Sequence, residues 1–235
     1  MRRFWKEVST QQSAWGFGIQ LDGKPLKTPM RNALLLPTVA LTDAVVAEWR
    51  GVEKEIDPAA MPFTGFANAA IDHVAPDRTE FAARIAAYGT TDAFCYRAEA
   101  EDALAVRQAA EWDPWLDWAR TRYDVSFTLV EGIMPQPQPA ASMEKLGAVV
   151  AARGTFELAA MAKLAHLSGS LVATLALIEQ AGSAAELWTT CCLDEIWQEE
   201  LWGSDYWAQK NRSDRQAEFM LAAQFLDLLR VYSLE

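Results

Sequence analysis

Hydrophobic and polar positions alternate along residues 4–28, as they do in strands. Residues 15–21, WGFGIQL, show the pattern of a half-buried strand, and Asp22-Gly23 supplies the positive backbone φ values of a tight hairpin turn. The next segment, 24–29, is expected to be the return strand. Its two prolines cannot donate to a ladder, so it should lie at an edge. The N-terminal part is therefore predicted to form a small sheet.

The period becomes helical after residue 38. Val45, Trp49 and Val52 recur at helical spacing, and Pro58 ends that element. Nearly everything beyond Thr64 also has helical periodicity. The pattern thus predicts an α+β chain with a small N-terminal α+β part and a larger helical part, divided somewhere between residues 56 and 77.

Capping and stop signals predict where the helices begin and end. The pair Asp113-Pro114 resembles a cap followed by a first-turn proline, which predicts two helices within 102–123. Ser183 and Glu186 form a capping-box pattern that opens a helix closed by Gly203. The apolar stretch 164–178 is shorter than the ~20 residues of a membrane helix and is predicted to be a buried helix.

Two further elements complete the expected fold. Residues 125–130, VSFTLV, are the one late strand candidate, and they could return to the N-terminal sheet. The final helix, over roughly 214–231, is too apolar to be merely a surface helix.

Composition narrows the function classes. The chain has 235 residues, 51% of them hydrophobic and 23% charged, which is the balance of a globular protein. Its formal charge of -11 argues against binding to nucleic acid or anionic membranes, because proteins bind these through clustered Lys and Arg. Three cysteines without a spaced pattern suit free thiols in a reducing compartment. The N-terminus lacks the apolar segment of a secretory signal.

The sequence offers few constellations for catalysis. His73, His166 and the pair Cys191-Cys192 are too far apart in sequence to show zinc-ligand spacing, and no glycine-rich phosphate loop is present. We therefore expect neither a metal nor another cofactor. His166 is interpreted as a hydrogen-bonded core histidine on an apolar helix.

The segment 194–205, DEIWQEELWGSD, is the most unusual in the chain. On a helix, Glu195, Glu199 and Trp202 share one face, and like charges four residues apart destabilise a helix by roughly 0.2–0.5 kcal/mol. Three interpretations remain: a solvated acidic face, the carboxylate pair of a hydrolase, or a binding surface in which Trp supplies buried area and the acids select a basic partner. Trp and Glu together at a helix end favour the binding surface over the hydrolase.

Many short motifs recur in order along the chain: PLKTP (25–29), PT (37–38), EW (48–49), MPFT (61–64), ANAAID (67–72), TD (91–92), CYR (95–97), RQ (107–108), WDP (112–114), GS (169–170), DE-x-WQ (194–198) and WG (202–203). With these motifs the chain closely resembles the assembly chaperones for the alpha subunit of F-type ATP synthase. The resemblance extends from Phe4 to the C-terminal helix.

The resemblance implies a binding protein and not an enzyme. Such a chaperone holds the unassembled alpha subunit without using ATP, shields its subunit interface and promotes assembly of the catalytic sector. The implied fold is a small α+β domain, taken as 1–65, packed on an orthogonal helical bundle, 66–235. Because the chain starts close to its first family motif, we expect a bacterial, cytoplasmic member; a mitochondrial matrix protein would require that a transit peptide had been removed. We expect a monomer.

Candidate site residues follow from combining the acidic segment with the resemblance. The residues expected to bind the alpha subunit are Asp194, Glu195, Gln198, Glu200, Trp202, Gly203 and Asp205. The residues expected to be structural are Trp49, Asn68, Asp72, Trp112 and Asp113, with Asp113 as a helix cap and Asn68 with Asp72 as a hydrogen-bonded pair or a joint between domains. The competing hydrolase would draw its carboxylate pair from Asp92, Asp113, Asp194 and Glu195.

Overall fold

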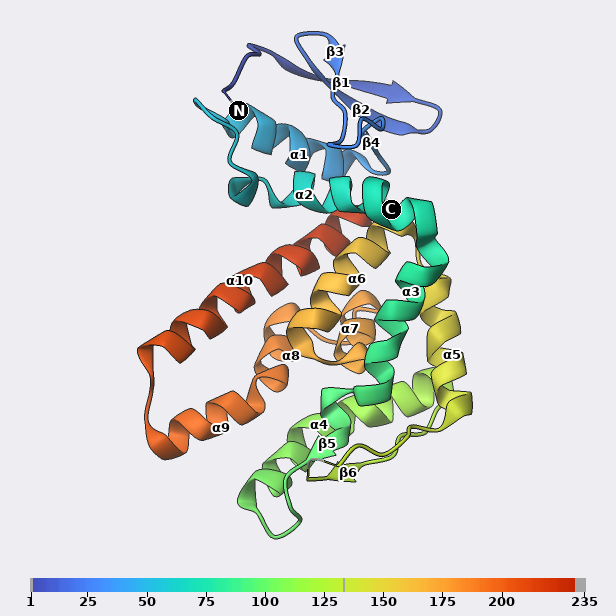
Figure 1. The fold of residues 1–235 in the computed structure, drawn as a ribbon, viewed down its shortest axis with the longest axis vertical. Coiled ribbons are helices and arrows are strands. Elements are labelled where there is room, and N and C mark those ends of the chain that lie inside the picture. Colours follow the sequence, from blue (N-terminus) through green and yellow to red (C-terminus); the bar gives the residue numbers. More distant parts are fainter. Residues whose placement is uncertain (1, 133, 231–235) are drawn as a thin grey trace, which may run out of the picture. The chain divides into compact units, whose positions relative to one another are not determined.

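The computed structural model describes residues 2–132 and 134–230, which divide into two compact units (Figure 1). The sheet unit comprises residues 2–78, 154–160 and 224–230. The helical unit comprises residues 79–153 and 161–223. A small sheet region beside a larger helical part confirms the expected α+β class.

A four-stranded antiparallel sheet is the centre of the sheet unit. Strands β1 (Val8–Ser13) and β2 (Gly16–Leu21) form a hairpin, and β2 also pairs with β3 (Lys24–Pro25) and β4 (Leu35–Leu36). The turn between β2 and β3 is the predicted one, because Asp22 and Gly23 have φ values of 48° and 75°. The proline-containing strand β3 lies at the end of the strand order, as a strand with a missing donor should.

Two helices complete the sheet unit. Helix α1 (Val39–Gly51) packs against β1 and β2, and its first turn is capped by Thr38, whose Oγ1 accepts the N–H of Leu41 at 3.2 Å. Its apolar stripe is buried, as the helical spacing predicted. Helix α2 (Pro62–Ala69) begins where the Glu48 carboxylate accepts two backbone N–H groups, so an acid of α1 fixes the start of α2.

The remaining elements are α3 (Arg78–Ala86), β5 (Tyr96–Arg97), α4 (Ala103–Tyr123), β6 (Val130–Glu131), α5 (Ala140–Ala151), α6 (Thr155–Ser168), α7 (Leu171–Ile178), α8 (Ala184–Cys191), α9 (Leu193–Trp202) and α10 (Tyr206–Leu229). Helices α6 and α10 contribute residues to both units.

Helix α7 is the buried centre of the helical unit. All eight of its residues are buried, and α4 and α8 pack against it. The predicted single buried helix over 164–178 is instead two helices. Gly169 adopts φ 66°, and Ser170 caps α7 by accepting the N–H of Ala173 at 3.0 Å. A positive φ cannot continue a helix, so α6 ends there.

Helix α4 corrects the prediction of a break at Asp113-Pro114, since it runs without interruption through Pro114. The missing proline N–H deprives only the carbonyl of Ala110, which is on the exposed side of the helix. Meanwhile Trp112, Leu116 and Ala119 are buried at helical spacing. Burial of that face outweighs one lost backbone hydrogen bond.

The segment 125–130 does not join the N-terminal sheet, which corrects a second prediction. Only β6 at its end is paired, in parallel with β5 of the helical unit. Upstream, side chains satisfy the backbone: Ser142 Oγ accepts the N–H of Ser126 at 2.8 Å, and the Gln138 amide makes two hydrogen bonds to the backbone of Thr128. Strand-like residues are thus extended here without a ladder.

The helix predicted from Ser183 to Gly203 is divided at Cys192 into α8 and α9. Its predicted ends are nevertheless correct, because the Ser183 capping box is formed and Gly203 follows α9 with φ 86°. Helix α10 begins at Tyr206 and not near residue 214, since Asp205 Oδ1 accepts the N–H of Ala208 at 2.8 Å. The predicted end at 231 lies outside the described residues.

Candidate functional site

Exposed aromatic side chains surround the turn between α9 and α10. Leu201, Trp202, Tyr206 and Trp207 are 57%, 78%, 68% and 72% exposed. We call these four residues the aromatic tip. The rings of Tyr206 and Trp207 meet edge to face with centroids 5.3 Å apart. Isolated exposed apolar residues are ordinary, whereas these four lie within seven positions of the chain.

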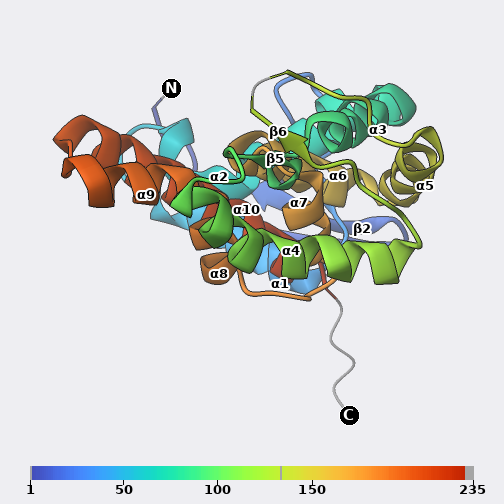
Figure 2. The same cartoon turned by 90° about the horizontal axis from the view of Figure 1, so that it is seen from below.

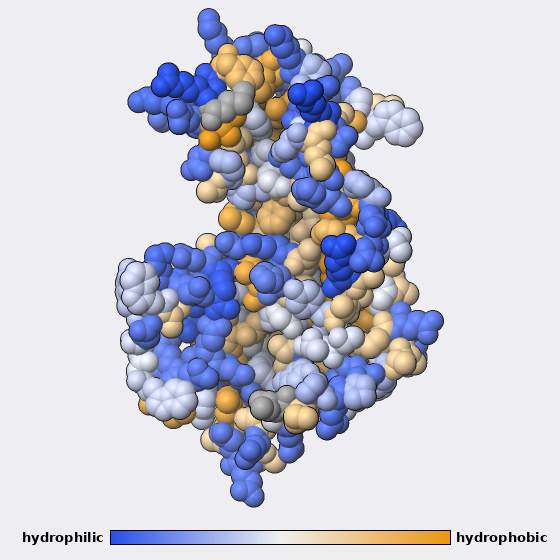
Figure 3. Space-filling model, in the orientation of Figure 1, coloured by the Kyte–Doolittle hydropathy of each residue, from blue (hydrophilic) through white to orange (hydrophobic). Residues whose placement is uncertain are grey.

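The aromatic tip is at the end of a projection. In Figures 1 and 2, α9 and the first turns of α10 extend away from the rest of the helical unit. Every residue from 201 to 210 is exposed. We call α9 together with residues 203–215 the arm. Figure 3 shows a mostly hydrophilic surface over the arm, with paler residues among the blue ones.

Ion pairs connect the two helices of the arm. Both oxygens of Glu195 accept from Arg215 Nη2 at 2.6 Å. Glu199 pairs with Arg212 and also accepts from the Gln209 amide. The hydrogen bond from Arg212 holds the pKa of Glu199 below its ordinary value. The like-charge cost of Glu195 and Glu199 within α9 is therefore offset by cations of α10, and these acids are not unpartnered as their helical spacing alone suggested.

Two other acids connect α9 to α4. Asp194 Oδ1 accepts from Gln108 Nε2 at 2.8 Å, and Gln108 itself is buried. Glu200 pairs with Arg107 at 2.5 Å, and the same guanidinium lies 5.7 Å from the ring centroid of Trp197. These contacts fix the base and one side of α9.

A groove of about 230 Å³ lies between the two helices of the arm. Among the residues that line it are five of the seven predicted binding residues: Glu195, Gln198, Trp202, Gly203 and Asp205. Asp194 and Glu200 instead make the contacts with α4 described above. The groove is smaller than the usual 300–1,000 Å³ of a small-molecule pocket.

Tyr206 and Trp207 are exposed aromatic residues that were not among the predicted site residues. Both fall within the first helical turn after the Gly203 stop, where aromatic residues have no buried neighbours to cover them. The available signal was the run LWGSDYW at 201–207, in which large apolar residues stand on both sides of a helix stop.

The predicted structural tryptophans are buried, each within its own unit. Trp49 packs on Trp5 with ring centroids 5.1 Å apart in the sheet unit. In the helical unit, Trp112 stacks on Phe94 and donates from Nε1 to the carbonyl oxygen of Thr190 at 2.9 Å. Both therefore contribute large apolar areas to a core.

Asp113 is not the cap that its sequence position suggested. It lies inside α4 and pairs with Arg97, whose side chain is almost fully buried, at 2.7 Å. The pair satisfies a guanidinium that also donates from Nε to the carbonyl oxygen of Phe94. The proline that follows Asp113 made the position resemble a helix start.

Asp72 is buried in a π-helical turn and binds the loop between β3 and β4, not Asn68 as a helix-surface pair would require. Its carboxylate accepts from Thr28 Oγ1 at 2.7 Å, from Asn32 Nδ2 at 2.8 Å and from the N–H of Met30 at 3.1 Å. Burial raises the pKa of Asp72, but these hydrogen bonds outweigh it, and the pKa is lowered overall. Asp72 thus anchors this loop within the sheet unit.

Asp92 is fully buried at the start of α7. Its Oδ1 accepts the N–H of Phe94 at 3.0 Å, and its Oδ2 accepts the N–H of Val172 at 2.9 Å. Burial raises the pKa of Asp92 to about 6, although the hydrogen bonds from Val172 and Ser170 act in the opposite direction. The carboxylate holds the first turn of a core helix.

The four carboxylates of the hydrolase hypothesis each have a different partner. Asp92 binds backbone N–H groups, Asp113 binds Arg97, Asp194 binds Gln108 and Glu195 binds Arg215. Of these four acids, Glu195 lines the groove of the arm.

Two of the three cysteine thiols are buried. Burial raises the pKa of the Cys95 and Cys192 thiols to about 12, so both are neutral at physiological pH. Across residues 2–132 and 134–230, no three His, Cys, Asp or Glu side chains gather in a way that could hold a metal ion. His166 is exposed, not in the core as expected, with Nδ1 3.5 Å from Tyr88 Oη. Within the same residues, no helix combines the length and the apolar character needed to cross a membrane.

Charge is concentrated in the helical unit. Residues 79–153 and 161–223 contain eleven basic and twenty acidic side chains, a formal charge of −9 out of the −11 of the whole chain. The arm belongs to this unit and combines exposed aromatic rings with six of these acidic side chains.

Solved structures place the chain among chaperones. Its fold matches the crystal structure of Atp12 from Paracoccus denitrificans with a TM-score of 0.93 and 40% identity, over 97% of this chain and 98% of that chain. A mutant of the same Paracoccus protein matches with a TM-score of 0.93 and 39% identity over the same shares. A protein from Agrobacterium tumefaciens matches with a TM-score of 0.91 and 35% identity, over 97% of this chain and 86% of that chain.

The chain belongs to the ATP12 chaperone family, whose sequence profile, described as ATP12 chaperone protein, matches residues 2–120. The resemblance to the chaperones of ATP synthase assembly, first seen in the short motifs, is thereby confirmed.

Proposed function

We propose that the protein is an ATP-independent chaperone that binds the unassembled alpha subunit of F-type ATP synthase, shields its subunit interface and promotes assembly of the catalytic sector. It acts as a monomer in the bacterial cytoplasm. Membership in the ATP12 chaperone family supports the chaperone role. The exposed arm supports the idea that this protein binds its client through an extended surface.

The observation that carries this proposal is the exposure of the aromatic tip. A chaperone that shields an interface must offer apolar area to it, and Trp and Tyr are the residues that most often dominate such contacts. Trp202 is 78% exposed, and it lines the groove beside Gln198 and Asp205. The tip is thus the part of the helical unit best suited to cover an apolar patch on a client.

The candidate residues take two roles in this proposal. Trp202, Gln198, Gly203 and Asp205 meet the client directly at the groove. Asp194, Glu195 and Glu200 hold α9 in place through Gln108, Arg215 and Arg107, and their remaining negative field favours basic residues of the client.

Co-expression of the alpha subunit with this chain tests the proposal. The double variant Trp202→Ala/Trp207→Ala is expected to reduce the amount of alpha subunit captured about tenfold or more, because truncating a central aromatic contact costs about 2 kcal/mol or more. Its melting temperature should stay within about 2 °C of the wild type, since neither side chain is buried. The readout is soluble alpha subunit retained on the tagged chaperone, with nucleotide removed by apyrase.

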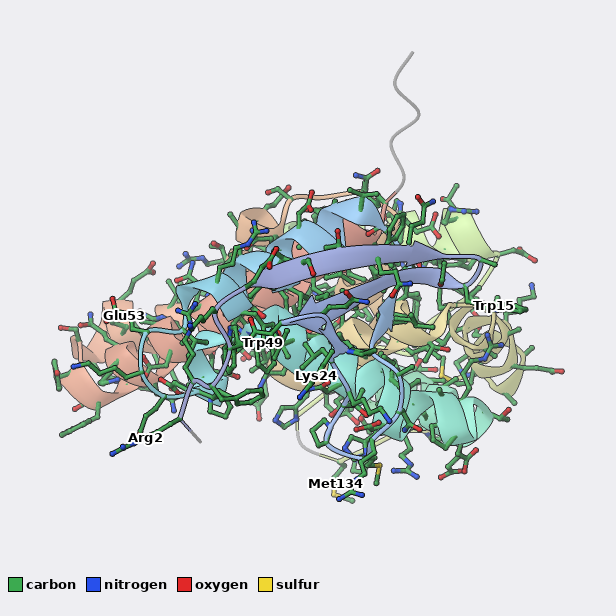
Figure 4. All side chains as sticks on the ribbon, turned by 90° about the horizontal axis from the view of Figure 1, so that it is seen from above. Arg2, Trp15, Lys24, Trp49, Glu53 and Met134 are labelled. Carbon is green, nitrogen blue, oxygen red and sulfur yellow. The ribbon has the colours of Figure 1, made fainter. Side chains whose placement is uncertain are left out.

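Trp15→Ala is the matched control, because Trp15 is 86% exposed on the β1–β2 hairpin of the sheet unit (Figure 4). This variant should capture the alpha subunit as the wild type does. Equal capture by the double variant and the control would contradict the assignment of the arm. Failure of the wild type to capture any alpha subunit would contradict the proposed client.

A further inference from the structure

A second recess opens on the sheet unit, with a volume of about 580 Å³. It is lined by residues 2–6 and 53–55. These two segments are joined through their backbones: the N–H of Arg3 donates to the carbonyl oxygen of Lys54 at 2.8 Å, and Arg2 pairs with Glu55 in an antiparallel bridge. In Figure 4, Arg2 and Glu53 lie at the same end of the sheet unit. The recess therefore has a fixed backbone frame.

Positive charge dominates this recess in an acidic protein. Arg2, Arg3, Lys6 and Lys54 line it, against the two carboxylates Glu53 and Glu55. The nearest ion pair, between Arg2 and Glu55 at 3.6 Å, joins two strongly exposed side chains. Such a pair contributes little, so Arg2 can exchange its partner.

None of the other three cations forms a salt bridge with a described residue, and the Asp22 carboxylate, which accepts the N–H of Lys6, attracts Arg3 and Lys6 only at longer range. The Arg3 guanidinium donates only to carbonyl oxygens, those of Val52 at 2.6 Å, Trp5 at 3.1 Å and Lys6 at 3.5 Å. The side chains of Lys6 and Lys54 are exposed and form no salt bridge with any described residue. In the helical unit, by contrast, arginines such as Arg107, Arg212 and Arg215 are paired with glutamates.

An exposed aromatic ring lies among these charges. Phe4 is 62% exposed and meets the buried ring of Trp5 edge to face at 5.1 Å. The contact with Trp5 positions the Phe4 ring, most of which stays exposed to solvent. An exposed ring in a recess with four cations and two carboxylates complements a peptide that places an apolar side chain between carboxylates.

We propose that this recess is a docking site for an acidic peptide segment of a partner protein, with an apolar side chain on Phe4 and carboxylates on Lys6, Lys54 and Arg2. The site is separate from the aromatic tip and does not depend on the identity of the client bound by the arm. It gives an acidic chaperone a second surface with the opposite electrostatic preference.

The test uses the full-length protein and a fluorescein-labelled synthetic peptide of about ten residues, in which glutamates flank a leucine and a phenylalanine, a length that spans the recess when extended. Binding is measured by fluorescence anisotropy at low salt. The variant Lys6→Glu/Lys54→Glu should bind this peptide at least about tenfold more weakly, because reversing two contact charges replaces attraction by repulsion. Phe4→Ala should weaken binding about three- to tenfold through loss of the aromatic contact.

The matched control is Lys24→Glu/Lys27→Glu, which makes the same charge change at two exposed lysines that do not line the recess. Lys24 stands two residues after Asp22, whose carboxylate accepts the N–H of Lys6, so this control lies near the recess without lining it. This control should weaken peptide binding much less than Lys6→Glu/Lys54→Glu does, because neither of its lysines lines the recess. Thermal melts of both double variants verify that they are folded.

Three results would overturn the proposal. The first is the absence of peptide binding to the wild-type protein, and the second is equal binding to the two double variants. Binding to vesicles of phosphatidylserine and phosphatidylcholine, without binding to the peptide, would assign the cations to a membrane surface instead. Because the assay contains no alpha subunit, none of these results bears on the function proposed for the arm.

Discussion

Two acid-containing regions of the helical unit show opposite ways of accommodating negative charge. At the start of α7, the single carboxylate of Asp92 is fully buried and is bound by backbone N–H groups. Along the arm, Glu195 and Glu199 remain near the surface and are bound by the arginines of α10. All eight residues of α7 are buried, whereas every residue of the arm from 201 to 210 is exposed.

The difference shows which region contributes to stability and which is available to a partner. Buried N–H groups without an acceptor are costly, so Asp92 is needed for the core to form. Surface ion pairs contribute little, so the arm can be held in a defined position and still be deformed at small cost. The predictions below test that difference, from the largest expected effect to the smallest.

Removing the buried carboxylate should give the largest loss. Asp92→Ala leaves the N–H groups of Phe94 and Val172 without their acceptor in the core. We expect the free energy of unfolding at pH 5 to fall by about 3–5 kcal/mol. Urea denaturation followed by circular dichroism measures this change. A loss below about 1 kcal/mol would show that α7 does not depend on Asp92.

The same residue should make stability depend on pH. Burial raises the pKa of Asp92 from 3.8 to about 6, so the folded protein binds this proton more tightly than the unfolded chain does. The contribution of the protonated group is complete below pH 3.8 and is lost as the pH rises through about 6. The stability difference between wild type and Asp92→Ala should therefore shrink by roughly 1–3 kcal/mol from pH 4 to pH 7. A constant difference across that range would contradict this sign.

Breaking an ion pair of the arm should have only a local effect. Glu199→Gln removes the charge that binds Arg212, and amide hydrogen exchange in α9 and the first turns of α10 is expected to become about two- to fivefold faster. Exchange in α7 and the global unfolding midpoint should not change. Glu186→Gln, at the exposed start of α8, is a control that should leave exchange in the arm as it is. Slower amide exchange in the arm, or a large shift in the global unfolding midpoint, would contradict the proposed difference between the arm and the Asp92 region.

The elements that could be predicted from the sequence are those specified by local chemistry. Asp22-Gly23, the Ser183 capping box and the Gly203 stop each determine a backbone conformation within a few residues, and each is present. Pro114 and the segment 125–130 depend instead on distant partners. Burial of Trp112 and its neighbours keeps α4 continuous, and Ser142 and Gln138 supply the hydrogen bonds that a strand would have taken from a sheet.

For the candidate site, the sequence indicated a segment but not the contacts that its residues make. Residues of the acidic segment do line the groove, but helix geometry cannot reveal that Arg212 and Arg215 approach from the next helix to pair with its glutamates. For the same reason the sequence indicated the acids as the unusual feature, whereas the structure indicates the exposed rings beside them. The sequence offered Asp92 as a possible catalytic acid because neither the burial of its carboxylate nor its hydrogen-bond donors can be read from a single sequence.

The aromatic tip also bears on how the free protein behaves in solution. Exposed Trp and Tyr rings favour self-association, because two copies of the protein can bury these apolar surfaces against each other. The helical unit carries a formal charge of −9, and this shared negative sign makes two approaching copies repel each other. At physiological salt the repulsion extends roughly 8 Å, and at 1 M salt only about 3 Å. The negative charge of the helical unit thus opposes self-association through the exposed rings of the tip, and this protection weakens as salt is added.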